Sequence, residues 1–170
     1  WTSVGGDTLQ IEVNVMPGKG ELKLTGQMGD VMKESAMTAL TYVRSICPQY
    51  DVPDDYFAKN DIHIHIPEGA VPKDGPSAGI TMATAMFSAV VNRKVLAKVA
   101  MTGEITLWGR VLPIGGLKEK ILAAKMAHME TVLVPEKNRP DMAELSKEIT
   151  RGLDIVYVKA MEDVVSEAFV

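Results

Sequence analysis

The sequence has few of the features that stabilise secreted proteins or anchor membrane proteins. Cys47 is its one cysteine, so no disulfide can form within the chain. A single thiol suits a reducing compartment, and we therefore expect a cytoplasmic protein. No run reaches the roughly 20 apolar residues that a membrane span needs, and the nearest run, 78–91, is interrupted by threonine and serine. The start has no signal-peptide pattern, and because it begins at Trp1 we expect a fragment of a longer protein.

Charge and histidine are also scarce. The formal net charge is −4 and no block of like charges occurs, which argues against nucleic acid or an anionic membrane as a partner. Two of the three histidines, His63 and His65, share one face of a predicted strand. A metal site would need a third ligand, and only Glu68 is near in sequence. We therefore expect no metal in this domain.

The spacing of apolar residues predicts a single compact α+β domain. A chain of 170 residues buries enough surface for one core. Strands are predicted at 9–15, from 22, and at 62–66, 99–103, 105–112, 131–134 and 154–158, and helices at 30–47, 76–91, 117–129, 140–149 and 161–169. The first two strands are predicted to pair as a hairpin, and Asp30 to cap a helix whose apolar side includes Val31. Because later strands alternate with helices, we expect a mixed sheet with hairpins followed by βα units.

Residues 73–79, Lys-Asp-Gly-Pro-Ser-Ala-Gly, are the most informative stretch. Ser77 is predicted in the first turn of a helix, where unpaired N–H groups and the helix dipole stabilise an oxyanion. Asp74 is a candidate cap for the same helix. A plain helix cap is the competing interpretation of Ser77. The stretch also matches Gly-x-Ser-x-Gly, the nucleophile elbow of α/β-hydrolases, but no strand precedes it directly, and Glu119 and His128 lie on opposite faces of one predicted helix.

A serine without a suitable histidine needs another base, and a lysine can serve if its pKa falls toward neutrality. The helix predicted from 117 carries two lysines in its first turn, where the helix dipole disfavours positive charge. Lys120 lies on a flank with Ala123 and Ala127, which leave room for it to fold inward, whereas Lys118 lies on the other flank. Glu119 is expected to point into solvent. A solvated surface charge is the competing interpretation for either lysine.

Three stretches together resemble a known family. They are Pro-Lys-Asp-Gly-Pro-Ser-Ala-Gly at 72–79, Met-Thr-Gly-Glu-Ile-Thr-Leu at 101–107 and Gly-Arg-Val-Leu-Pro-Ile-Gly-Gly-Leu-Lys-Glu-Lys at 109–120. With these, essentially all 170 residues resemble the proteolytic domain of the Lon family, the ATP-dependent serine peptidases of bacteria and organelles. The resemblance implies the Lon protease-domain fold, Ser77 as nucleophile, Lys120 as general base and a hydrogen bond from Thr102 to that lysine.

The resemblance also implies a larger assembly. Lon proteins carry an ATPase module before this domain and form hexameric rings whose active sites face an inner chamber. Residues 1–170 are then the proteolytic domain, with the ATPase and N-terminal domains absent, and no Gly-x-x-x-x-Gly-Lys-Ser/Thr phosphate loop occurs here. We expect no cofactor in this domain, and ATP and Mg in the full-length parent. The expected partners are unfolded or damaged polypeptides and further copies of the chain.

The predicted function is therefore a serine endopeptidase with a Ser-Lys dyad. The alternative is a non-catalytic ring-assembly domain, whose signature would be a missing dyad member. The stretch Glu68, Gly69, Ala70, Val71 and Pro72 is expected to offer backbone groups to an extended substrate, as an added strand does. Trp108 is left open as a core residue, an interface residue or a wall of the substrate site.

Overall fold

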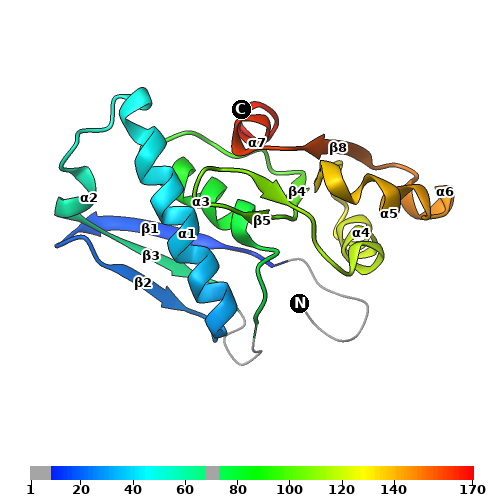
Figure 1. Ribbon diagram of the computed structural model, residues 1–170, viewed down its shortest axis with the longest axis horizontal. Helices are drawn as coiled ribbons and strands as arrows, with labels where there is room; N and C mark the ends of the chain where they lie inside the picture. Colours follow the sequence, from blue (N-terminus) through cyan, green and yellow to red (C-terminus); the bar gives the residue numbers. More distant parts are fainter. Residues whose placement is uncertain (1–8, 68–72) are drawn as a thin grey trace.

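The computed structural model describes residues 9–67 and 73–170, and these form an α+β domain. The first half contains a three-stranded sheet with helices against it, and the second half a parallel sheet with shorter helices (Figure 1). The strands are β1 (Glu12–Pro17), β2 (Leu22–Thr25), β3 (Asn60–His65), β4 (Val99–Met101), β5 (Glu104–Ile105), β6 (Val111–Leu112), β7 (Thr131–Pro135) and β8 (Asp154–Val158).

The helices alternate with the later strands, as predicted. They are α1 (Asp30–Ile46), α2 (Tyr56–Lys59), α3 (Gly79–Val91), α4 (Leu117–Met126), α5 (Arg139–Ala143), α6 (Lys147–Thr150) and α7 (Met161–Ala168), with short 3-10 turns at Cys47–Tyr50 and Glu136–Asn138. The predicted helix over 140–149 is wrong as one element, because Ser146 has extended backbone (ψ 151°) and separates α5 from α6. Gly29, not Asp30, is the N-cap of α1, and Val31 is 46% exposed instead of facing the core.

The predicted hairpin between the first two strands is also wrong. The sheet order is β1-β3-β2, with β1 antiparallel and β2 parallel to β3, so the sheet is mixed. Strand β3 is central, and Ile62 and Ile64 within it are buried, as is Ile66 directly after it. The turn after β1 closes around Asp61 instead, whose Oδ1 accepts N–H groups from Lys19, Gly20 and Glu21 at 2.9, 3.1 and 2.8 Å.

The predicted strand over 105–112 is a hairpin, β5-β6, with an exposed tip. The Gly109 N–H donates to the Thr106 carbonyl at 3.0 Å, and the positive φ of Gly109 (+83°) lets the chain reverse. Trp108 at this tip is 87% exposed, which rules out the core interpretation.

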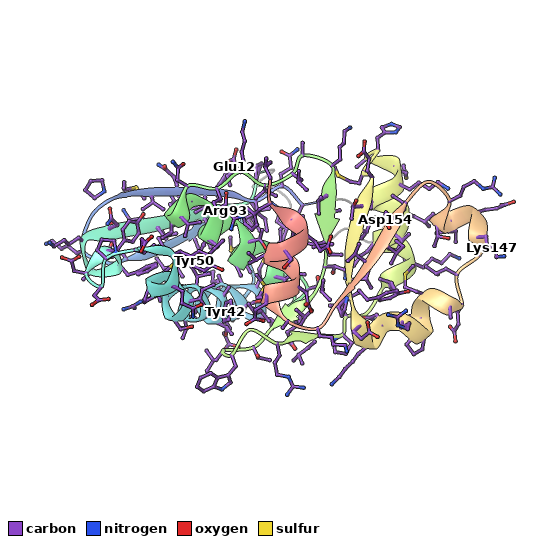
Figure 2. All side chains as sticks on the ribbon, turned by 90° about the horizontal axis from the view of Figure 1, so that it is seen from above. Glu12, Tyr42, Tyr50, Arg93, Lys147 and Asp154 are labelled. Atoms are coloured by element: carbon purple, nitrogen blue, oxygen red, sulfur yellow. The ribbon has the colours of Figure 1, made fainter. Side chains whose placement is uncertain are left out.

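Two hydrophobic cores lie in the two halves of the molecule. The larger one joins β3, α1, α3 and α7, and the smaller one lies between α4, β7 and α5. Figure 2 shows this division along the long axis, with Tyr42 and Tyr50 in one half and Asp154 and Lys147 in the other. The second sheet, β4-β7-β8, is parallel and its edge strand β4 reaches toward the first half.

Replacing Asp61 with asparagine is expected to lower the melting temperature at pH 7. The N–H of Glu21, with those of Lys19 and Gly20, holds the pKa of this carboxyl below its usual value. The stability it adds is therefore present above the unfolded pKa of about 3.9 and is lost as the pH falls through the lower folded value. In thermal melts, the difference in melting temperature between wild type and Asp61→Asn should be smaller at pH 3 than at pH 7. Asp54→Asn, at an exposed position, is the matched control; an equal loss there would contradict the assignment.

Candidate active site

Ser77 lies in a tight turn immediately before α3, and not in the first turn of the helix as the sequence suggested. The helix begins at Gly79 with Ala78 as its N-cap, since ψ of Ala78 is 4°. The Gly79 N–H donates to the Pro76 carbonyl at 3.1 Å and closes the turn. Ser77 is left half-buried at the end of the helix.

Gly103 holds the backbone of this turn from the other side. Its N–H donates to the Ser77 carbonyl at 2.9 Å, and its carbonyl accepts the Ile80 N–H at 3.1 Å. A side chain at Gly103 would force its surroundings to shift, because a Cβ would lie 2.8 Å from Cγ1 of Val111. The sequence analysis expected unpaired N–H groups at this helix start, but the Gly79 and Ile80 amides already donate to carbonyl groups. An oxyanion would need other donors in this conformation.

Asp74 caps α1 and not the helix after Ser77, so that part of its predicted role is wrong. Its Oδ1 accepts the Gly75 N–H at 2.8 Å and the Met32 N–H, in the first turn of α1, at 3.0 Å. These two hydrogen bonds hold the pKa of the Asp74 carboxyl below its usual value. Gly29, the N-cap of α1, leaves space that the Asp74 carboxylate occupies. Asp74 therefore joins the Ser77 loop to a distant helix.

Lys120 lies in the first turn of α4 and is half-buried, while Lys118 and Glu119 beside it are exposed. Its Nζ donates to the Gly115 carbonyl at 3.0 Å. Gly116 adopts a left-handed conformation (φ 66°) at the helix start, so the chain doubles back toward the lysine. Burial distinguishes Lys120 from Lys118, as the sequence predicted.

Burial also lowers the pKa of Lys120, because desolvation disfavours the ammonium form. Glu119 acts in the opposite direction, and burial outweighs it. The first turn of α4 adds a second unfavourable influence, since the positive end of a helix dipole repels a cation. Lys120 thus loses its proton more readily than a fully solvated lysine, and the neutral amine is the form that accepts a proton.

Thr102 lies between β4 and the turn that carries Ser77. It is buried, its N–H donates to the Leu133 carbonyl at 3.1 Å, and its Oγ1 donates to the Ser77 carbonyl at 3.5 Å. The backbone of Thr102 is therefore fixed to β7, and its hydroxyl touches the backbone of the serine. Its predicted hydrogen bond to the lysine stays a prediction.

Ser77, Thr102 and Lys120 line a single cavity of about 340 Å³. The rest of the lining is mainly apolar and comes from α3, β4, α4, β7 and residues 9–11. Small side chains such as Ala85 and Ala123 keep it open. Three residues that lie far apart in the sequence thus meet at a pocket of the size that binds organic ligands.

The two histidines of β3 are joined by one threonine. Thr25 Oγ1 lies 2.8 Å from His63 Nε2 and 2.7 Å from His65 Nδ1. Within residues 9–67 and 73–170, no group of three or more His, Cys, Asp or Glu side chains could hold a metal ion. Among those same residues, no helix is long and apolar enough to cross a membrane.

Sequence reasoning missed Lys73, whose residue is only 3% exposed. Its Nζ donates to the carbonyls of Gly26 at 3.0 Å and Ile66 at 3.4 Å. A lysine between a proline and an aspartate gives no periodic signal of burial, so only its closeness to Ser77 could have drawn attention to it. The substrate-binding prediction for residues 68–72 lies outside the described residues.

The fold is an α+β domain in which a serine and a lysine line one cavity. The family model for the Lon protease (S16) C-terminal proteolytic domain matches residues 1–170. The chain therefore belongs to that family, as the three sequence motifs indicated.

Similar proteins carry the Lon name. The chain is 68% identical to the Lon protease of Lachnoclostridium phytofermentans over 170 residues, all of this chain and 21% of that protein. It is 58% identical to the Lon protease of Roseiflexus castenholzii over 164 residues, 96% of this chain and 20% of that one. Lon protease 1 of Bacillus subtilis is 54% identical over 170 residues, which are all of this chain and 22% of that relative. The chain thus spans about a fifth of the length of these relatives.

Replacing Lys120 with methionine is expected to raise the melting temperature at neutral pH. The folded pKa is lower than the unfolded value of about 10.4. The cost of burying the lysine is therefore fully present below the folded pKa and disappears as the pH rises through the unfolded one. Methionine has a similar shape and carries no such cost.

Thermal melts between pH 6 and pH 10.5 measure this effect, with Lys118→Met, at the exposed lysine of the same helical turn, as the control. The stabilisation by Lys120→Met should shrink with rising pH, and the control should stay close to wild type. A Lys120→Met protein that melts below wild type at pH 7 would show that burial does not penalise this lysine.

Proposed function

We propose that this domain is a serine endopeptidase in which Ser77 is the nucleophile and Lys120 the general base. The observation that carries the proposal is that both residues line the same cavity. The lowered pKa of the lysine supports it. A base must be within reach of the nucleophile and must be neutral when it acts; the shared cavity supports the first condition and the lowered pKa the second. Membership of the Lon proteolytic-domain family supports peptide bonds as the substrate.

The reaction follows from these roles. The Lys120 amine takes the proton from Ser77 Oγ while Oγ bonds to the carbonyl carbon of the substrate. The tetrahedral oxyanion collapses, the C–N bond breaks, and the Lys120 ammonium protonates the departing amine. The acyl-enzyme ester is then attacked by water, which Lys120 deprotonates, and the proton returns to Ser77 as the acid product leaves. The Gly115 carbonyl accepts one N–H of Lys120 and so restricts how the amine is turned.

Thr102 is a positioning residue in this scheme. Its backbone is bonded to β7 and its hydroxyl contacts the carbonyl of Ser77, so it transmits the position of the second sheet to the nucleophile. A further hydrogen bond from its hydroxyl to Lys120, as the family resemblance implies, would orient the amine.

The apolar part of the cavity would take the side chain on the acyl side of the cleaved bond. It extends from Ser77 past Thr81 and Ala85 on α3 and past Ala123 on α4. An uncharged, bulky side chain is favoured there, because a charged one would lose its water without gaining a partner.

The proposal for the whole protein rests on its longer relatives. Residues 1–170 would be the proteolytic domain of a parent protein that also carries an ATPase module, which uses ATP and Mg to deliver unfolded or damaged polypeptides. The parent would assemble into a hexameric ring with the Ser77 sites facing an inner chamber, and would act in the cytoplasm. The names of the relatives and their roughly fivefold greater length support this arrangement.

Ser77→Ala, Lys120→Ala and Lys120→Arg are each expected to reduce hydrolysis of an unfolded protein by at least about a thousandfold. Alanine removes the nucleophile or the base, and arginine keeps its charge at neutral pH and cannot accept the proton. The measurement is the rate of fluorescent casein hydrolysis by the full-length protein with ATP. Wild-type rates in either Lys120 variant would disprove the dyad.

Covalent labelling separates this proposal from a non-catalytic ring-assembly domain. A small phosphonylating reagent should modify Ser77, as mass spectrometry of the labelled peptide would show, and Lys120→Ala should label slowly. An assembled ring, verified by its size on gel filtration, that takes up no label would favour the assembly role.

Filling the cavity is expected to reduce the hydrolysis of peptides with large side chains on the acyl side more than that of peptides with small ones. Ala85→Phe should lower kcat/KM for peptides with leucine or phenylalanine on the acyl side by about tenfold or more, while peptides with alanine there lose less. Ala89→Phe is the matched control, because this residue lies one turn further along α3 and outside the cavity lining. An equal loss for every peptide would contradict a side-chain pocket.

A further inference from the structure

Lys73 is a buried lysine for which the proposed mechanism has no use. The residue is 3% exposed, although lysine is seldom fully buried, and its ammonium must be hydrogen-bonded to be tolerated there. Methionine would fill such a place without that penalty. The position of Lys73, four residues before Ser77, suggests what the ammonium contributes.

The backbone of Lys73 is docked on the segment that joins β2 to α1. Its N–H donates to the Gln27 carbonyl at 3.0 Å, and its carbonyl accepts the Gly29 N–H at 2.7 Å, which makes a parallel bridge opposite Met28. Its Nζ donates to the carbonyl of Gly26 in the same segment at 3.0 Å. The N–H, the carbonyl and the side chain of Lys73 therefore all bind the segment between β2 and α1.

The ammonium also joins the ends of two strands. The last ladder bond between β2 and β3 runs from the Ile66 N–H to the Thr25 carbonyl at 3.2 Å. The next carbonyls along each chain, those of Gly26 and Ile66, both point at Lys73 Nζ, at 3.0 and 3.4 Å. Lys73 thus continues the parallel pair past its last ladder bond and fixes it to the loop that leads to the serine.

The turn with Ser77 is therefore held from two sides. Upstream, Lys73 and Asp74 fix the chain to β2, β3 and α1; downstream, Gly103 holds the backbone of Ser77 itself. Between these two anchors lies Gly75, with φ of +101° and no heavy atom within 4 Å of where a Cβ would stand. Packing around Gly75 therefore does not fix the conformation of the turn. The direction of the chain from Gly75 to Ser77 depends instead on how Lys73 and Asp74 hold the preceding residues.

We propose that Lys73 is a positioning residue: its buried ammonium fixes the turn of Ser77 relative to Lys120 by joining it to the ends of β2 and β3. The inference rests on the dyad of the proposed function. Lys73 is not among the residues that line the cavity, so its loss would displace the nucleophile without changing the wall that binds substrate. A displacement of the nucleophile lowers the rate of the chemical step, whereas substrate affinity is kept.

The test is Lys73→Met in the full-length protein with ATP. For each folded site, kcat for a fluorogenic peptide should fall by about tenfold or more while KM stays within about threefold. The rate at which a small phosphonylating reagent modifies Ser77 should fall in parallel with kcat. Wild-type kcat and labelling in the folded variant, or a loss confined to KM, would overturn the proposal.

Phe169→Leu is the control for a merely structural effect. Phe169 packs against Phe87 in the larger core. Its replacement by leucine is expected to lower the melting temperature without changing kcat per folded site. An equal loss of kcat in Phe169→Leu would show that instability explains Lys73→Met. If Lys73→Met does not fold, Lys73→Arg, which keeps N–H donors on a larger head group, should fold with reduced kcat and unchanged KM; wild-type kcat there overturns the role.

Ser77→Ala, measured in parallel, distinguishes a failure of the positioning role of Lys73 from a failure of the proposed dyad. An inactive Ser77→Ala beside a fully active Lys73→Met would overturn the positioning role alone. An active Ser77→Ala would overturn the dyad, and with it the role of Lys73.

Discussion

The pair of hydrogen bonds between Gly103 and the start of α3 is the constraint on which the rest of the site depends. Gly103 donates to Ser77 and accepts from Ile80, at 2.9 and 3.1 Å, and a side chain at this position would force Val111 or the backbone to shift. Because Gly103 lies two residues after the end of β4, these bonds join a helix of the first half to the edge strand of the second sheet. The turn with Ser77, the hydroxyl of Thr102 and the wall of the cavity all take their positions from this junction.

Lys120, in contrast to Gly103, lies where its own charge is disfavoured. Both burial and the positive end of α4 disfavour its charge, and one hydrogen bond to the Gly115 carbonyl offsets part of that cost. The neighbouring Lys118, in contrast, is exposed. An unfavourable position for a cation is a favourable one for a base, which gives a physical reason for a half-buried lysine in the cavity that Ser77 also lines.

The sequence predicted the fold class, most elements and the two residues that meet in the cavity, because these leave local signals in periodicity and in motifs. What it missed is non-local. The order β1-β3-β2 depends on Asp61 binding a turn some 40 residues earlier, and the cap of α1 is Asp74 from the Ser77 loop. Lys73 reaches back 47 residues to Gly26. Proline at 76 favoured a helix start, but the Gly103 contact requires a turn there, and tertiary bonding prevailed over local preference.

The two members of the proposed dyad belong to different cores. Ser77 precedes α3, which packs in the larger core, whereas α4 carries Lys120 and buries Leu117 and Ile121 in the smaller one. The distance between serine and lysine is therefore not a property of either helix. It is set where β4 bonds to β7 on one side and, through Thr102 and Gly103, to the Ser77 turn on the other. Any change that shifts one half against the other acts on the dyad directly, which makes the junction at β4, and not the two side chains alone, the element that decides whether the site is assembled.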